Sequence, residues 1–429
     1  MHIAIITAGG AGMYCGSCMH DNTWARALID FGELVTLIPT YTPIRVDEEN
    51  ASSRRVFLGG LNVYLRSRSR FWRVLPRFLT RWVDAPWVIN FATRFGVSND
   101  AHELGSLTQS MLDADDGLQR EQYGELARYL SEELRPDVIC FSNALLAGAL
   151  PAIRRVFSGP ILCTLQGDDI FLDGLIEPYR SAVRSRRKSV VQGFDGFITH
   201  SAYYRDHMSR YLEVPVEKFR LLPLGIDLQG HTGESRLRAS EPFTVGYFAR
   251  ICPEKGLHQL IEAFRLLRRR HPTVKLLAGG YLGKRDAAYF QQIQRDADDL
   301  GDSFRYIGSP DRAGKQAFFQ QIDVLSVPTV YQEPKGIYVL EALANGIPVV
   351  LPRHGAFPEL IAATGGGVLV EPGNATALAA QLEALLLNSA ARVQIGEQGR
   401  AVVHANYHPQ ALATQTLQLF QAARREKSL

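Results

Sequence analysis

The sequence contains no long apolar run, few cysteines and almost no excess of either charge. No stretch of its 429 residues reaches the roughly 18 apolar residues of a membrane-spanning helix. The formal net charge is only +3, which gives no reason of its own to expect a nucleic-acid partner. The first residues, MHIAIIT, have the pattern of a strand, with neither the basic start nor the cleavage site of a secretory signal. These absences lead us to expect a cytoplasmic protein.

The few cysteines agree with a reducing compartment. Cys140, Cys163 and Cys252 each stand alone within apolar sequence, as buried free thiols do. Cys15 and Cys18 form a C-x-x-C, but the chain has no second C-x-x-C to complete a structural zinc site. We therefore expect no metal and favour small residues packing under a tight loop. A metal or redox role for this pair stays open as an alternative.

Strand-like apolar runs alternate with helical patterns along nearly the whole chain. This alternation predicts an α/β protein with parallel sheets, and the length calls for two domains of Rossmann-like size. A polar, glycine-containing stretch at residues 230–241 separates the two halves. The expected strands are Ile3–Thr7, Leu34–Pro39, Asn62–Leu65, Val138–Phe141, Ile161–Leu165 and Gly196–Thr199 in the first half, and Thr244–Phe248, Val274–Ala278, Phe304–Ile307, Val324–Val327, Pro348–Leu351 and Gly367–Val370 in the second.

The segment YQEPKGIYVLEALANGIPVVLPRHGAFPE, residues 331–359, carries the most specific signal. Glu333 and Glu341 are separated by seven residues, and Gly336 opens an apolar helical run between them. The amides of Gly336 and Ile337 then lie at a helix N-terminus, which is a site suited to a diphosphate. One carboxylate can accept the hydroxyls of a ribose, and the other is left for a second polyol. This combination predicts a nucleotide-sugar site.

The same segment resembles the retaining family 4 glycosyltransferases of the GT-B fold, whose pattern is E-x-F-G-x-x-x-x-E. The match extends through the following LEALANGIPVV. The resemblance implies that Glu333 contacts the donor sugar, that Glu341 binds the nucleotide ribose, and that two Rossmann-like domains face an interdomain cleft. Lys335 replaces the usual Phe, so its ammonium either reaches the diphosphate or an anionic acceptor, or is solvated.

A second match, VGYFARICPEKGLHQLIEAF at residues 245–264, resembles the family's G-x-x-x-R-x-x-x-E-K-G segment. Arg250 follows a strand and Lys255 precedes a helix. Cations placed there stabilise the charge that grows on a departing nucleoside diphosphate. Surface charge is the alternative, but a lysine at a helix N-terminus is unfavourable. We therefore assign Arg250, Lys255 and Glu333 as the catalytic residues.

The first half offers weaker candidates. The loop TAGGAGMYCGSC lacks a dinucleotide fingerprint, and its Gly9, Gly10 and Gly12 are candidates for close approach to the donor. After the strand at 161–165, Gln166-Gly167 stands where many family members carry a His. Asp168 and Asp169 follow it and either contact the acceptor or donor sugar or cap a helix.

Arginines and aromatic residues are interleaved between Arg66 and Arg94. This pattern is consistent with a helical excursion packing its aromatic residues inward, or with peripheral contact to an anionic membrane or a lipid-linked acceptor on the inner face. Single-stranded nucleic acid could also stack on such aromatic residues, but we expect no nucleic-acid partner.

Together these features predict a metal-independent retaining glycosyltransferase that needs no cofactor besides its nucleotide-sugar donor and acts on an unidentified acceptor. The expected N-terminal domain covers residues 1–228 plus a C-terminal crossing helix at 407–429. The nucleotide-sugar-binding domain covers residues 229–406. Another GT-B chemistry, such as a nucleotide-sugar epimerase or a glucan synthase, stays open, and so does a non-catalytic nucleotide-sugar-binding subunit.

Overall fold

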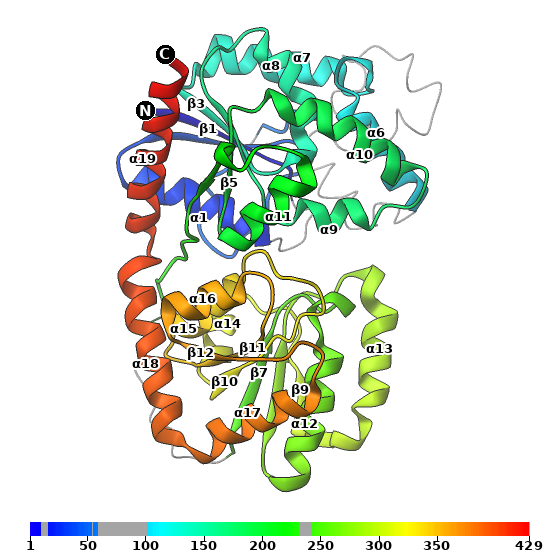
Figure 1. Cartoon of the computed structure of the whole chain (residues 1–429), viewed down its shortest axis with the longest axis vertical. Coiled ribbons are helices and arrows are strands. Elements are labelled where there is room, and N and C mark those ends of the chain that lie inside the picture. The colour runs from blue at the N-terminus through cyan, green and yellow to red at the C-terminus, as the bar shows by residue number, and fades with distance from the viewer. Residues whose placement is uncertain (10–15, 54, 59–100, 232–241, 429) are drawn as a thin grey trace. The chain divides into compact units, whose positions relative to one another are not determined.

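Two six-stranded parallel sheets organise the chain, and each forms the centre of its own unit (Figure 1). The computed structural model describes residues 1–9, 16–53, 55–58, 101–231 and 242–428. Unit 1 consists of Met1–Pro223 together with Leu412–Leu429, and unit 2 of Leu224–Ala411. The predicted α/β class with two Rossmann-like parallel-sheet domains is confirmed.

The sheet of unit 1 has the order β2-β1-β3-β4-β5-β6, and every neighbouring pair is parallel. Because β1 lies between β2 and β3, the strand order reverses beside it. Its strands are β1 (His2–Thr7), β2 (Leu34–Pro39), β3 (Val138–Phe141), β4 (Ile161–Thr164), β5 (Gly196–Thr199) and β6 (Phe219–Leu221). The helices are α1 (Gly16–Asp30), α6 (Ala101–Leu112), α7 (Arg120–Arg128), α8 (Leu150–Arg154), α9 (Asp168–Asp173), α10 (Tyr179–Val190), α11 (Ala202–Leu212) and α19 (Pro409–Ser428).

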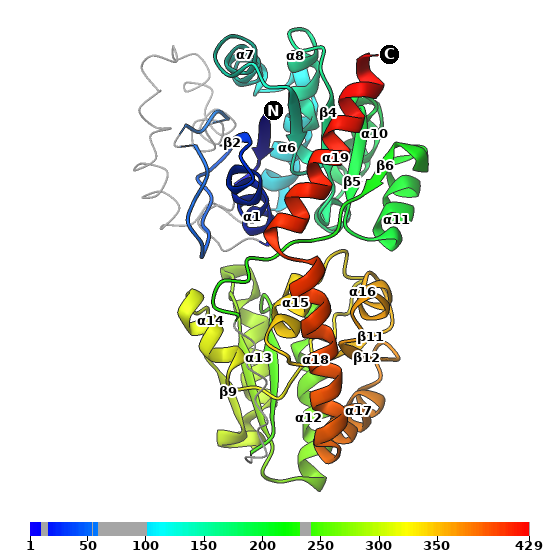
Figure 2. The same cartoon turned by 90° about the vertical axis from the view of Figure 1, so that its left-hand side faces the viewer.

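Successive residues of a strand point to opposite sides of the sheet. Because these strands are continuous apolar runs, both faces of the sheet are apolar. On one face, Ile3 and Ile5 pack with residues of α1 and α19. On the other, Ala4 and Ile6 pack with residues of α7 and α11. The Trp24 indole on α1 donates a hydrogen bond to Thr416 on α19 at 2.8 Å. The last helix is therefore part of unit 1, as the two views show (Figure 2).

Unit 2 has the strand order β12-β11-β10-β7-β8-β9, again all parallel. This is the doubly wound order, and its reversal lies between β7 and β10, where such sheets bind ligands at their carboxyl ends. The strands are β7 (Thr244–Phe248), β8 (Lys275–Gly279), β9 (Phe304–Tyr306), β10 (Val324–Leu325), β11 (Val349–Pro352) and β12 (Gly367–Val370). The helices are α12 (Leu257–Arg270), α13 (Ala287–Asp296), α14 (Arg312–Phe319), α15 (Ile337–Ala344), α16 (Phe357–Thr364), α17 (Ala375–Leu387) and α18 (Ser389–Asn406).

Several sequence predictions fall outside the described residues. They concern Gly10, Gly12, Cys15, the expected strand Asn62–Leu65, the Arg66–Arg94 segment, and residues 232–241 of the stretch expected between the two halves. In the part of the chain that is described, no helix is both long and apolar enough to span a membrane.

Candidate active site

Three loops meet at the carboxyl ends of the central strands of unit 2, after β7, β10 and β11. Gly256 has φ +74°, and a Cβ on it would lie 1.8 Å from the Pro328 carbonyl oxygen, so the first two loops touch through their backbones. Gly355 has φ +61°, and a Cβ there would lie 2.6 Å from both the backbone nitrogen and oxygen of Glu333. The Ala356 amide also donates to the Glu333 carbonyl at 2.8 Å. The backbone of Glu333 is therefore fixed at the point where the strand order reverses.

The Glu333 carboxylate is buried, with 4% of the residue exposed, and one of its oxygens carries most of its hydrogen bonds. Oε2 accepts from Lys255 Nζ at 2.5 Å, from the Tyr331 hydroxyl at 2.8 Å and from the Tyr338 hydroxyl at 3.0 Å. Oε1 accepts one longer bond, from the Lys335 amide at 3.4 Å. The side chain is therefore anchored through Oε2, and Oε1 is the oxygen that a ligand hydroxyl can approach.

The neighbours of Glu333 keep it ionised. Burial on its own raises the pKa of a carboxyl, but the Lys255 charge and the three hydrogen bonds outweigh it and lower the pKa of Glu333 to about 2. Burial, followed by the charge of the same carboxylate, raises the pKa values of Tyr331 and Tyr338 well above the usual 10. At neutral pH, Glu333 is an acceptor of hydrogen bonds and has no proton to give.

Lys255 is held by the same two tyrosines. Its Nζ donates to the Tyr331 hydroxyl at 2.6 Å and lies 5.0 Å and 5.3 Å from the ring centres of Tyr331 and Tyr338. An ammonium has three N–H groups, and two of them serve Tyr331 and Glu333. The third is available to a ligand anion.

Arg250 is the more accessible cation of the site. Its side chain is 47% exposed, its Nε donates to the Cys252 sulfur at 3.2 Å, and Glu254 lies 3.9 Å from Nη2. The Cys252 contact fixes the inner end of the guanidinium, so the outer nitrogens can bind an anion in the bidentate manner typical of arginine.

Helix α15 begins beside Glu333. Gly336 is its N-cap with φ +78°, and no side chain caps the first turn within the described residues. The first amides of the helix are therefore donors that an anion can use. Lys335 is buried at the same turn, so its side chain is not a solvated surface charge. A carboxylate, a helix N-terminus and a second carboxylate thus follow one another from Glu333 through Gly336 to Glu341.

Glu341 is also paired with a lysine. Lys315 on α14 donates from Nζ to Glu341 Oε1 at 2.7 Å, and both side chains are largely buried. Glu341 follows Gly336 by five residues, which corresponds to about 7.5 Å along the helix axis at 1.5 Å per residue. That separation is comparable to the reach of a ribosyl phosphate.

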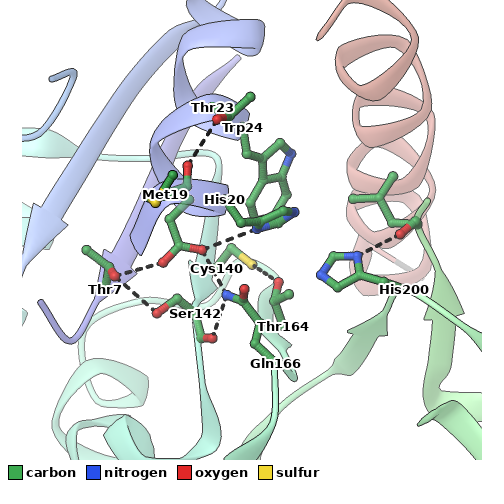
Figure 3. Close-up of polar contacts among 12 residues, drawn as sticks. Thr7, Met19, His20, Thr23, Trp24, Cys140, Ser142, Thr164, Gln166 and His200 are labelled. Carbon is green, nitrogen blue, oxygen red and sulfur yellow. Dashed lines mark hydrogen bonds and ion pairs between the residues drawn. The ribbon is translucent and has the colours of Figure 1, made fainter. Parts of the chain in front are cut away.

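Unit 1 has a polar cluster of its own at the carboxyl ends of its strands (Figure 3). Thr7, which ends β1, donates to Asp21 Oδ2 at 2.7 Å, and Gln166 Nε2 donates to Asp21 Oδ1 at 2.9 Å. Gln166 Nε2 also donates to the Ser142 carbonyl at 3.0 Å. These groups are buried and bonded to one another, so they hold α1 and the loops after β3 and β4 together.

Asp168 and Asp169, the predicted sugar contacts of unit 1, have different hydrogen-bond partners. Asp168 is 4% exposed, and its oxygens accept from the Ala144 and Gln166 amides at 2.8 and 2.9 Å. Asp169 instead accepts from the Tyr204 hydroxyl at 2.6 Å and lies 2.9 Å from His207 Nε2. Both carboxylates therefore hold local structure, and neither forms an N-cap of α9, whose N-cap is Gly167.

Gly9 and Cys18 both have packing roles in unit 1. Gly9 has φ +87°, and a Cβ on it would lie 2.1 Å from the Thr42 carbonyl oxygen, so Thr42 fills the space beside it. Cys18 is buried on α1 and is not part of a disulfide. Among the described residues, no group of three or more His, Cys, Asp or Glu side chains is arranged to hold a metal.

Three residues of this site were not predicted from the sequence: Tyr331, Tyr338 and Lys315. Tyr331 lies two residues before Glu333 and Tyr338 five residues after it. This proximity in the sequence could have indicated that they contact the carboxylate. Lys315 gave no such indication, because it lies 26 residues from Glu341 and on a different helix.

Known proteins match this chain over both units. The family of glycosyl transferases group 1 matches residues 233–402, and Glycosyltransferase Family 4 matches residues 111–229. The chain is a GT-B glycosyltransferase. The first of these two matches contains every residue described above at the unit 2 site.

Individual proteins agree with this assignment. The glycogen synthase of Mycobacterium tuberculosis is 27% identical over 296 residues, which are 68% of this chain and 70% of that relative. Sucrose-phosphate synthase from Thermosynechococcus elongatus superposes with a TM-score of 0.70 and 20% identity, covering 98% of each chain. Anabaena HepE, solved in complex with UDP, gives a TM-score of 0.68 and 17% identity over 98% of this chain and 100% of that one. These two structural likenesses show the shared fold.

Proposed function

We propose that this glycosyltransferase takes a hexosyl group from a nucleotide-sugar and transfers it to an acceptor with retention of the anomeric configuration. One observation carries the proposal. Glu333, the start of α15 and Glu341 follow one another in the order in which a nucleotide-sugar presents its sugar, diphosphate and ribose. Two carboxylates receive hydroxyls, and the helix N-terminus receives the negatively charged group between them.

The chemistry that we propose needs no proton from the protein. The bond between the anomeric carbon and the diphosphate oxygen breaks, and the acceptor oxygen bonds to that carbon on the same face. The acceptor proton passes to the departing phosphate oxygen. Lys255 and Arg250 supply positive charge where the diphosphate becomes more negative, which lowers the barrier. Glu333, ionised by its neighbours, accepts hydrogen bonds from the sugar and has no part as a general acid.

The first test is donor binding. The protein is heated with UDP-, GDP- and ADP-sugars in the presence of EDTA, because a ligand of the native state raises the melting temperature. We begin with UDP-glucose, since HepE binds UDP and UDP-glucose on the same fold. A shift with one nucleotide that is lost in E341Q supports the proposed site. No shift with any of them contradicts it.

Retention can be tested before the acceptor is known. Slow transfer of the sugar to water is followed by proton NMR with the nucleotide-sugar that binds, and the first free sugar is assigned before mutarotation. We expect an α-linked donor to release the α-anomer. Release of the β-anomer would contradict retention while leaving the donor site in place.

Glucan synthesis is a second candidate. It is favoured by the 27% identity to a glycogen synthase across two thirds of the chain. Incorporation of labelled sugar into an oligoglucan primer in successive steps would support it, and transfer of a single sugar to another acceptor would exclude it.

A further inference from the structure

The Lys315–Glu341 pair has a feature that the proposed donor site does not by itself explain. A lysine from α14 reaches across to a carboxylate on α15, and both side chains are about nine-tenths removed from solvent. Burying a lysine and a glutamate is costly even when they are paired, so such a pair gives little net stability. The feature needs a reason other than stability.

The pair leaves one carboxylate oxygen for a ligand. Lys315 Nζ occupies Oε1 at 2.7 Å, and within the described residues no hydrogen bond ends on Oε2. The backbone of Glu341 is fixed as well, because Asn345 Nδ2 donates to its carbonyl at 2.7 Å and lies 2.8 Å from His231 Nδ1. Rotation of the carboxylate would break the short contact to Lys315.

Lys315 is the cation that acts on this carboxylate. His231 also lies nearby, but burial lowers its pKa below 6.5, so it is neutral at pH 7. Arg312, on the same helix as Lys315, is bonded to Asp227 at 2.9 Å and to the Gln229 carbonyl at 2.6 Å.

We propose that Lys315 is a positioning residue for ribose recognition, which directs Glu341 Oε2 at a ribose hydroxyl and makes the site select ribonucleotides over deoxyribonucleotides. The inference rests on the proposed function, in which Glu341 receives the ribose. A hydroxyl donating to a fixed carboxylate makes a charge-assisted hydrogen bond. Its loss lowers affinity about tenfold or more.

The test measures binding of UDP, GDP and ADP, and of the 2′-deoxy and 3′-deoxy forms of the nucleotide that binds, by titration calorimetry. The proteins are the wild type, K315Q, E341Q and K315Q/E341Q. K275Q is the matched control, because it removes a lysine from the amino end of β8, opposite the site. We expect the wild type to prefer the ribonucleotide over at least one deoxy form about tenfold. K315Q should bind the ribonucleotide about tenfold more weakly than the wild type does. Its preference for the ribonucleotide over the same deoxy form should fall below about twofold.

The double variant separates a positioning role from a direct one. If Lys315 acts only through Glu341, K315Q/E341Q binds within about twofold of E341Q, because the two losses are not additive. A further tenfold loss in the double variant would overturn the positioning role. So would K315Q if it kept the full ribose preference.

Two outcomes are kept apart by the design. A wild type that binds none of the three nucleotides contradicts the proposed function itself. Binding without the expected loss in K315Q contradicts only this inference. If K315Q does not fold because Glu341 is left unpaired, E341Q and the uncharged double variant still decide the question, since the glutamine carbonyl of E341Q can still accept from Lys315 and the double variant contains neither charge.

Discussion

Two buried carboxylates, one in each unit, respond to burial in opposite ways. Glu333 in unit 2 and Asp168 in unit 1 are each 4% exposed. The pKa of Glu333 is lowered to about 2, whereas burial raises the pKa of Asp168 to about 6. Burial opposes ionisation in both, so the neighbours decide the result.

The neighbours differ in charge. Glu333 receives a lysine ammonium and two tyrosine hydroxyls, while Asp168 receives two backbone amides and has the carboxylate of Asp169 close by. A cation keeps a buried carboxylate ionised, whereas two neutral donors beside a like charge do not fully offset the loss of water. Glu333 is thereby kept ready to accept hydrogen bonds, and Asp168 ties two loops together.

Removing Lys255 should have the largest effect, because Glu333 then loses the cation that distinguishes it from Asp168. We expect K255M to lower turnover of the donor at least a thousandfold, because it removes a charge at the diphosphate, and to lower the free energy of unfolding by about 3–5 kcal/mol, because Glu333 is left buried and unpaired. Steady-state kinetics and urea unfolding measure the two effects.

The double variant K255M/E333Q is the control for the stability effect. It should regain most of the lost stability, since glutamine removes the isolated charge and its carbonyl oxygen can still accept from the Tyr331 and Tyr338 hydroxyls, and it should stay inactive. Full activity in K255M would contradict the role of Lys255 in the proposed reaction.

The pH dependence of stability should show the contrast with a smaller effect. Because the folded pKa of Glu333 lies below its usual 4.5, its contribution is present above pH 4.5 and is lost as the pH falls toward 2. The folded pKa of Asp168 is raised, so its contribution is present below pH 3.8 and is lost as the pH rises through 6. Each amounts to on the order of 3 kcal/mol.

Unfolding by urea between pH 3 and pH 7 checks both signs, within the range where the native state persists. The difference in free energy of unfolding between wild type and E333Q should shrink as the pH falls. D168N should become more stable relative to wild type as the pH rises from 4 to 7. Parallel curves for the two variants would contradict the opposite pKa directions.

The fold was predictable from the sequence where apolar runs are fully buried. The expected strands Val138–Phe141 and Gly196–Thr199 coincide with β3 and β5, since parallel strands covered on both faces stand out as short apolar runs. Helix α18 could not be predicted in this way. Its buried residues include Gly396, Gly399 and Arg392, which give no apolar periodicity.

The site was predictable only where its residues share one segment. Glu333, Gly336 and Glu341 could be placed in order because a loop and one helix carry them all. The partners that fix them come from other places: Lys255 precedes α12 and Lys315 lies on α14. Such pairs depend on how the helices pack onto the sheet, and this information has no local pattern in the sequence.

The smallest predicted effect distinguishes the two tyrosines at Glu333. Tyr331 accepts from Lys255 and donates to Glu333, whereas the Tyr338 hydroxyl donates to Glu333 alone. Y331F removes two hydrogen bonds and should lower kcat about tenfold, while Y338F removes one and should lower it about threefold, with donor affinity nearly unchanged. Steady-state kinetics and nucleotide titration of both variants measure this. Equal losses would mean that the tyrosines act only on the carboxylate, and that the lysine is held by Glu333 without help from Tyr331.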